Sequence, residues 1–251
     1  MVGAPAAGDA VARARSLPNL AIGLHIVLVE GRPVLPPETI PNLVDGTGQF
    51  DRNMMRAGIR FFFDPRTRRQ LAAEIRAQFA AFRATGLALD HVNTHKHMHI
   101  HPTVAALIVA IGREFGMRAM RLPLEASSTL RHAAAAEGAR ISRPLYTPWI
   151  MLLRRRLKRG GLALNDHLLG LAWSGAMTEA RMLRLLASLP EGITELYCHP
   201  AVAQTPMLRL TMPDYRPAEE LAALVSPAIR RLVLSEKLEL VSYRDLTAAQ
   251  A

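Results

Sequence analysis

Apolar and polar positions alternate along the chain in blocks that predict strands and helices in turn. The run 20–29 is almost wholly apolar, which is typical of a strand buried on both faces of a parallel sheet. A loop rich in proline and glycine follows from 30 to 48. From 65 to 85, apolar residues recur at helical spacing opposite a row of arginines. A strand followed by a loop and a covering helix is the unit from which α/β proteins are built.

The same alternation continues toward the C-terminus. Gly86 and Gly116 are expected to end the helices that precede them. We expect further helices at 9–16, 103–115, 124–139, 178–188 and 218–234, and further strands at 117–122, 193–200 and 238–242. The segment 146–160 has an apolar half with a tryptophan, followed by a cluster of cations. It fits either an interfacial membrane helix or a surface helix whose apolar stripe faces the core.

Histidines concentrate between 91 and 101, a stretch that holds five of the nine in the chain. Those from His95 to His101 occupy every second position. In an extended strand such side chains share one face, so the pattern predicts imidazoles that converge on one point, and Pro102 disfavours a helix here. Imidazole is a common metal ligand and a general acid or base near neutral pH. We favour a metal or catalytic role over a solvated strand end or a structural hydrogen-bonding cluster.

Further candidate residues stand in or at the ends of predicted strands. His25 lies in the first apolar run, Arg121 comes shortly before Pro123, and His199 closes a later strand. Active residues of α/β proteins gather at the carboxyl ends of parallel strands. His25, His95, Arg121 and His199 are therefore expected to belong to one site.

Two histidines on a divalent ion would suit amide hydrolysis, which also needs a third ligand and a carboxylate base. His199 would suit the acid that protonates the departing amine. Asp90, Asp166 and Glu195 are candidate carboxylates, and none of them stands out as ligand or base. No HExxH or CxxC motif is present.

The composition narrows the class of protein. A length of 251 residues suits one domain of barrel size or two smaller ones. One cysteine, Cys198, and no recognisable signal peptide lead us to expect a cytoplasmic protein. The net charge of +10 suits anionic lipid or nucleic acid, but aromatics make up only 5% of the chain and arginines recur along helical faces. This pattern disfavours nucleic acid.

Four motifs in order along the chain resemble those of a known family. They are Gly23–His25, Asn93–His99, Asn165–His167 and Glu195–Pro200. Together they resemble the YdjC-like carbohydrate deacetylases, and the resemblance covers nearly the whole chain. The stretches 28–36 and 171–178 are similar to the subgroup associated with hopanoid lipid biosynthesis.

This resemblance implies a fold and an activity. The fold is a variant (β/α) barrel related to polysaccharide deacetylases, as a single domain over 1–251 with an inserted basic helical segment around 141–165. The implied activity is metal-dependent hydrolysis that removes an N-acetyl group from an amino sugar. The resemblance to the subgroup implies that this sugar is part of a glycosylated hopanoid lipid. By matching motifs, His25 and His95 correspond to the family's two histidine metal ligands. His199 matches a histidine that we assign as acid or substrate contact.

Other features stay open at this point. The ion is zinc, which suits two imidazoles and a carboxylate, or magnesium, which the resemblance also allows. We expect support of the ligands or substrate contact from His97, His99, Arg121, Asp166 and Glu195. The segment 146–160 would give peripheral contact with the inner face of the membrane. The oligomeric state is not specified.

The chain departs from the family pattern in one respect. The family's first strand ends in an Asp-Asp pair, one a metal ligand and the other the base, and no such pair occurs in these 251 residues. We therefore expect a barrel without its first β/α unit, roughly thirty residues, from a truncated form or a start codon placed too far downstream. The alternatives are a catalytically impaired metal- or sugar-binding remnant and a membrane-peripheral component of a lipid pathway.

As written, the chain is predicted to bind metal weakly and to hydrolyse little, because two imidazoles without the aspartates make an incomplete site. A deacetylation assay compares it with a form extended by the aspartate-bearing strand. Equal activity of the two forms would contradict this prediction.

Overall fold

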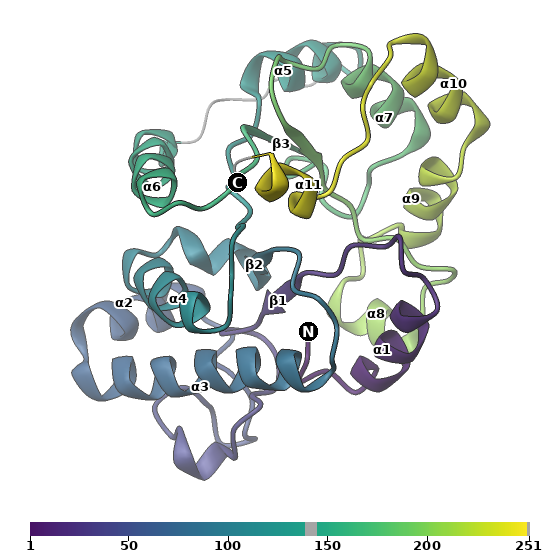
Figure 1. Cartoon of the computed structure of the whole chain (residues 1–251). Coiled ribbons are helices and arrows are strands. Elements are labelled where there is room, and N and C mark those ends of the chain that lie inside the picture. Colours follow the sequence, from purple (N-terminus) through teal and green to yellow (C-terminus); the bar gives the residue numbers. More distant parts are fainter. Residues whose placement is uncertain (139–144, 250–251) are drawn as a thin grey trace. The chain divides into compact units, whose positions relative to one another are not determined.

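The computed structural model describes residues 1–138 and 145–249 (Figure 1). Short strands alternate with helices, and η1 and η2 are 3-10 helices. The elements in chain order are α1 (Ala7–Arg15), β1 (Leu24–Ile26), η1 (Pro37–Thr39), α2 (Met54–Phe63), α3 (Pro65–Ala84), β2 (Val92–Thr94), η2 (His95–Ile100), α4 (Pro102–Glu114), α5 (Ser127–Ala135), α6 (Thr147–Arg159), β3 (His167–Leu169), α7 (Glu179–Leu186), β4 (Thr194–Leu196), α8 (Pro206–Thr211), α9 (Pro217–Leu224), α10 (Pro227–Ser235) and α11 (Tyr243–Ala248).

The chain divides into two compact units, each with one parallel pair of strands. Unit 1 holds Met1–Arg121, Arg155–Leu164 and Val241–Ala251, and unit 2 holds Leu122–Arg154 and Asn165–Leu240. β1 pairs with β2 in unit 1, and β3 pairs with β4 in unit 2. The α/β class with parallel strands is thus confirmed. The closed barrel and the single domain stay predictions, and 141–144 of the expected insertion lie outside the described residues.

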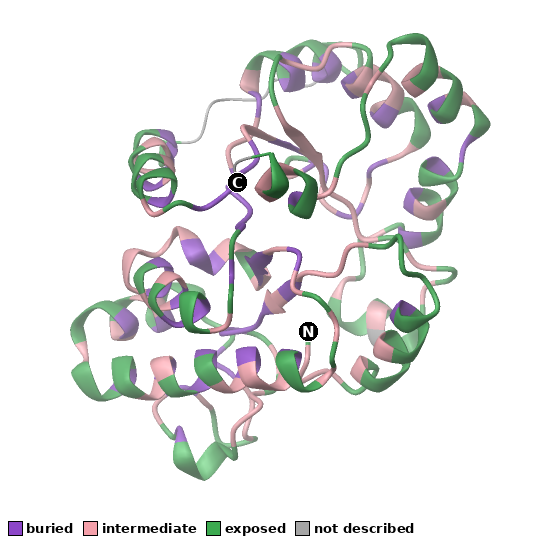
Figure 2. Cartoon of the chain, viewed as in Figure 1, coloured by how far each residue is buried: buried purple, intermediate pink, exposed green. Residues whose placement is uncertain are grey.

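Helix α3 shows why the helical pattern in unit 1 could be read from the sequence. Asp64 caps it by accepting a hydrogen bond from the Arg66 amide, and Pro65 occupies its first turn. The predicted apolar stripe, from Leu71 to Phe82, is buried, while the opposite face is exposed (Figure 2). Gly86 follows with a φ of +74°, a conformation that glycine adopts without strain. The predicted helix at 65–85 is confirmed.

A polar row on α3 determines where β1 ends. The Gln78 side chain bonds both the N–H and the C=O of Val27, at 3.0 and 2.7 Å. Glu74, one turn earlier, accepts the backbone amides of Val34–Leu35 at 2.9 and 3.0 Å. These side chains take backbone groups that a neighbouring strand would otherwise bind. As a result β1 covers three residues, and the long strand expected within 20–29 is wrong.

Unit 2 has its own core. α5 and α7 pack around the segment that follows β3. The buried members of this cluster are Ala126, Leu130, Ala133, Ala134, Leu169, Trp173, Met177 and Leu185. The buried Asn165 side chain bonds both the N–H and the C=O of Leu122, at 2.6 and 2.8 Å. It therefore satisfies backbone groups as a strand partner would.

Several elements near the C-terminus differ from the prediction. The helix expected at 218–234 is two helices, because Pro227 disfavours helix at Ser226, whose hydroxyl caps α10 instead. Residues 238–242 form no strand, and Leu240 is 82% exposed. Of the strand expected at 117–122, only isolated bridges at Ala119 and Met120 are present. The helix expected at 124–139 is α5, which begins later, and residue 139 lies outside the described part.

Helix α6 lies within the predicted basic segment 146–160. Ile150, Leu153 and Leu157 are 1–3% exposed, so its apolar stripe faces protein. This burial agrees with the surface-helix alternative rather than with an apolar face in lipid. Over the residues that the structure covers, we find no helix with the length and apolar character to cross a bilayer.

The contact between Glu74 and the loop predicts a specific loss of stability. Glu74→Ala leaves two amides without their acceptor, at about 1–3 kcal/mol each, so urea denaturation should show a clear decrease in the free energy of unfolding. Glu114→Ala is the control, because Glu114 forms an exposed ion pair with Arg76 and its loss should change stability little. Equal effects of the two substitutions would show that the Glu74 contacts do not hold the loop.

Candidate active site

The pairing of β1 with β2 brings the first two predicted ligands together in unit 1. The register sets His25 opposite Asn93, and β2 ends at Thr94, immediately before His95. The His25 and His95 rings have centroids 5.8 Å apart and planes inclined by 70°. Two residues separated by seventy positions thus present their imidazoles to one another.

The histidine stretch has the predicted conformation only in its first part. Val92–Thr94 form the expected strand as β2, but His95–Ile100 form η2, so the expected row of imidazoles on one face is wrong. His99 turns inward, and its Nδ1 lies 2.7 Å from the Thr94 hydroxyl. His101 donates from Nε2 to the Gly58 carbonyl at 3.0 Å. A 3-10 helix turns its side chains in different directions. Of this run, His95 has its ring packed edge-on against that of His25.

Backbone strain follows His95 directly. Lys96 and His97 have φ values of 51° and 52°, the left-handed region that side chains other than glycine rarely adopt. The Lys96 ammonium is held by Glu30 at 2.8 Å. Consecutive strained residues cost roughly 1–3 kcal/mol each and are concentrated at functional sites. The strain therefore supports a functional role for this turn.

Burial keeps the imidazoles of His25 and His99 neutral. The pKa of His25 is lowered to about 3, first because the ring is desolvated, then through the charges of the N-terminus, His95 and Arg121, although its bond with Asn93 opposes the shift. The pKa of His99 is also well below its ordinary value, mainly through burial. Arg121 itself is buried, and its charge acts on both rings. A neutral imidazole is the form that binds a metal.

The imidazole nitrogens of His25 and His95 are donors that suit a divalent ion. Imidazole nitrogens bind zinc at about 2.0–2.1 Å, which puts each ring centre about 3 Å from the ion. A centroid separation of 5.8 Å suits two rings on one ion. Among the described residues, no set of three or more His, Cys, Asp or Glu side chains is arranged to hold a metal. The chain thus offers two fitting ligands, His25 and His95, for such an ion.

Asp90, one of the candidate carboxylates, acts elsewhere in unit 1. Its Oδ2 accepts from His91 Nδ1 at 2.8 Å, and its Oδ1 accepts from the Arg244 amide at 2.8 Å. Burial would raise its pKa, but these hydrogen bonds hold the pKa below the ordinary value. A carboxylate with both oxygens engaged in this way is a structural anchor.

His199, Asp166 and Glu195 belong to unit 2. His199 Nε2 lies 2.8 Å from the Tyr197 hydroxyl, and the His199 amide donates to Glu220. Asp166 accepts from Arg154 and from the Ile193 amide, which makes it a support of the β4 segment. Glu195 lies on β4 in register with Leu168. No local pattern in the sequence singled out Glu220, because it lies 21 positions from His199.

Tyr215 is a further neighbour of His199 that the sequence did not single out. Its ring centroid lies 5.0 Å from that of His199, and its hydroxyl is 2.9 Å from the Ser174 hydroxyl. Tyr197 approaches His199 edge-on from another side, with centroids 4.6 Å apart. Two tyrosines thus orient this imidazole.

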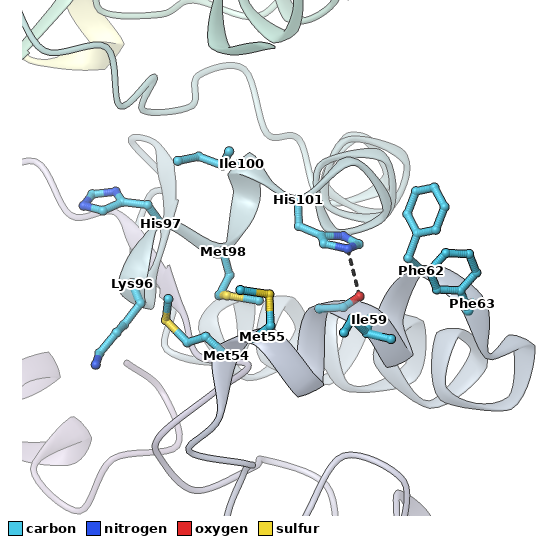
Figure 3. A pocket seen from close by; sticks show the side chains of 11 residues that line it. Met54, Met55, Ile59, Phe62, Phe63, Lys96, His97, Met98, Ile100 and His101 are labelled. Atoms are coloured by element: carbon cyan, nitrogen blue, oxygen red, sulfur yellow. Dashed lines mark hydrogen bonds between the residues drawn. The ribbon is translucent and has the colours of Figure 1, made fainter. Parts of the chain in front are cut away.

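An apolar groove of about 500 Å³ lies between α2 and the turn that contains η2. Figure 3 shows Met54, Met55 and Met98 gathered along it, with His97 and Lys96 at one end. The lining side chains are Met54, Met55, Ile59, Phe62, Phe63, Lys96, His97, Met98, Ile100 and His101. Phe63 is 71% and Met55 76% exposed, so large apolar surface faces solvent along this groove. Such patches mark binding sites.

These features define an α/β protein with paired imidazoles at the end of a parallel strand pair. The chain belongs to the YdjC-like protein family, whose model matches residues 1–235. It is 26% identical to a carbohydrate deacetylase from Geobacillus stearothermophilus over 98% of this chain and 84% of that protein. It is 28% identical to a carbohydrate deacetylase from Vibrio cholerae over 99% of this chain and 84% of that protein.

A solved structure shares the fold. It is described as a candidate cellobiose-phosphate cleavage protein from Enterococcus faecalis V583, with a TM-score of 0.71 and 23% identity. The match covers 98% of this chain and 85% of that protein. At this identity the likeness concerns the fold alone.

The neutral buried histidines predict that acid weakens the fold. An unfolded histidine takes up a proton below about pH 6.5, whereas folded His25 stays neutral down to about pH 3. The free energy of unfolding should therefore fall as pH falls below 6.5, by up to about 1.4 kcal/mol per pH unit for each such histidine. Urea denaturation of the metal-free chain at pH 7.5, 6.0 and 5.0 measures this, and His25→Gln should make the decline shallower. A flat profile over this range would rule out buried neutral imidazoles.

Proposed function

We propose that this protein hydrolyses the N-acetyl group of an amino sugar. Support comes from membership in the YdjC-like family and from curated relatives named carbohydrate deacetylases, which match along nearly the whole chain. The observation that carries the proposal is the approach of His25 and His95, with ring centroids 5.8 Å apart, beside a strained turn. The reaction adds water to the acetyl carbonyl carbon and breaks the C–N bond, giving acetate and a free amine.

His25 and His95 would hold a divalent ion. The ion would acidify a bound water and polarise the amide carbonyl. Two neutral imidazoles favour zinc over magnesium, which prefers oxygen ligands. Arg121, which is buried and acts on the His25 ring through its charge, would stabilise negative charge that develops on the carbonyl oxygen.

His199 is proposed as the acid that protonates the departing amine. Tyr197 and Tyr215 orient its ring, and Glu220 fixes the backbone beside it. Orientation of this kind is what a general acid requires. Asp166 and Glu195 would support the strand pair that carries His199, and His97 and His99 would support the turn after His95.

The substrate is proposed to be a glycolipid, a hopanoid in the subgroup that the sequence resembles. The apolar groove between α2 and η2 supports this, because its lining is almost wholly apolar and begins one residue after His95. A hydrocarbon group in such a groove would bury exposed Met55 and Phe63. The sugar would then lie at the imidazole pair.

Peripheral contact with an anionic membrane is proposed through 146–160. Arg155 and Arg159 are exposed on α6, while its apolar stripe is buried. Any such contact would therefore be electrostatic and sensitive to salt.

A second candidate function is a metal- or sugar-binding protein with little catalysis. One observation favours it: the described residues place no third ligand with His25 and His95. Such a protein would bind zinc or an N-acetylated sugar and release no acetate.

Acetate release decides between the two functions. The chain, incubated with zinc and an N-acetylglucosaminyl lipid, should release acetate slowly, and His95→Ala should reduce the rate to that of the metal-free protein. His132→Ala, at an exposed histidine on α5, is the control and should leave the rate unchanged. Release that survives both His95→Ala and a chelator would refute the proposed role of His95. Zinc binding without any release would identify the binding protein.

A further inference from the structure

A continuous chain of hydrogen bonds leads from a buried carboxylate to His25. Asp90 Oδ2 accepts from His91 Nδ1 at 2.8 Å. His91 Nε2 lies 3.1 Å from Asn93 Nδ2, and Asn93 Oδ1 lies 2.5 Å from His25 Nδ1. Asp90 and Asn93 are buried, with 7% exposure each, so water competes little for these bonds.

The donor and acceptor groups of these residues determine which atom carries the hydrogen in each of these hydrogen bonds. The Asp90 carboxylate only accepts, so the His91 hydrogen lies on Nδ1 and its lone pair on Nε2. That lone pair receives an N–H of the Asn93 amide, which turns the amide oxygen toward His25. An oxygen at that position accepts from His25 Nδ1–H. The second nitrogen of a neutral His25, Nε2, then carries the lone pair.

We infer that Asp90, His91 and Asn93 are positioning residues that fix the tautomer of His25, with its hydrogen on Nδ1 and Nε2 ready to bind a metal. Histidine ligands are commonly held in this way by a bond at their other nitrogen. Without these hydrogen bonds, the hydrogen of His25 could lie on Nε2. That tautomer presents an N–H where a metal ligand needs a lone pair.

Residues around His91 hold its ring in the position that these hydrogen bonds require. The Tyr243 ring stacks on His91 with centroids 4.5 Å apart and planes inclined by 30°. On Gly23, a Cβ would lie 2.5 Å from the His91 ring, so a larger residue would displace the ring. The amide of Arg244, next to Tyr243 on α11, bonds Asp90 Oδ1 at 2.8 Å. The C-terminal helix therefore supports both the carboxylate and the first imidazole.

The tautomer can be read directly in the metal-free protein. Long-range proton–nitrogen NMR spectra of the protein with ¹⁵N-labelled histidines should show the His25 hydrogen on Nδ1. The His25 signals are assigned by their loss in the His25→Gln variant. His91→Phe retains an aromatic ring against Tyr243 but removes both hydrogen bonds, so it should give a mixture of tautomers. A wild-type His25 with its hydrogen on Nε2 overturns the inference.

Zinc affinity, measured by calorimetry with Zn²⁺ alone, is the second readout. His91→Phe and Asn93→Leu should each weaken binding about 10- to 100-fold. Asn93→Asp still accepts from His25 Nδ1–H and should restore most of the affinity. His132→Phe is the matched control for His91→Phe and should bind as wild type. The contrary outcome is that the His91→Phe and Asn93→Leu variants both fold and keep the wild-type tautomer of His25 and the wild-type zinc affinity. In that case the hydrogen bonds from Asp90 through His91 and Asn93 do not position His25.

The zinc readout rests on the proposed function, whereas the tautomer readout does not. The predicted tautomer without zinc binding would support the positioning chain and reject the metal site. Should either substitution prevent folding, as judged by circular dichroism, the tautomer of wild-type His25 decides alone.

Discussion

The parallel pairing of β1 with β2 is the constraint on which the site depends. Its register sets His25 beside Asn93, and the end of β2 at Thr94 makes His95 the first residue of the following turn. The pair is only three residues long, because side chains of α3 take the backbone groups beyond Ile26. A shift by one residue would turn His25 to the other face of the sheet. The helices of unit 1 thus act on the site by limiting and holding this short pairing.

Burial sets the protonation state of His25 and His99, and it also lowers the stability of the fold in acid. Desolvation keeps His25 and His99 neutral, which is the state of a metal ligand. Arg121 adds positive charge to the same region and strengthens this preference. The strained residues Lys96 and His97 turn the chain sharply after His95. Local stability is therefore given up next to the point where the His25 and His95 rings face one another, as is common at functional sites.

The match of residues 1–235 establishes the family, and the geometry adds two facing histidines within unit 1. The chain belongs to the YdjC-like family, and its paired histidines suit the proposed deacetylation. The described residues add no third ligand, and Asp90, which lies shortly before His95 in the sequence, is engaged with His91 and Arg244. Both carboxylate oxygens of Asp90 therefore have partners within unit 1. The apolar groove between α2 and η2 begins one residue after His95.

Local patterns in the sequence were sufficient for helices such as α3 and α4, but not for the division of 218–234 into α9 and α10. Helix α3 follows from its cap, its apolar stripe and Gly86, all of which act within a few residues. The concentration of histidines pointed to the site, but their expected alternation on a strand was wrong, because two left-handed residues convert the run into a 3-10 turn. Only the tertiary structure decided which histidines face one another and which nitrogen of His25 is held. Those outcomes depend on contacts between residues far apart in the chain, such as His25 with Asn93 and His91 with Tyr243, which no local spacing specifies.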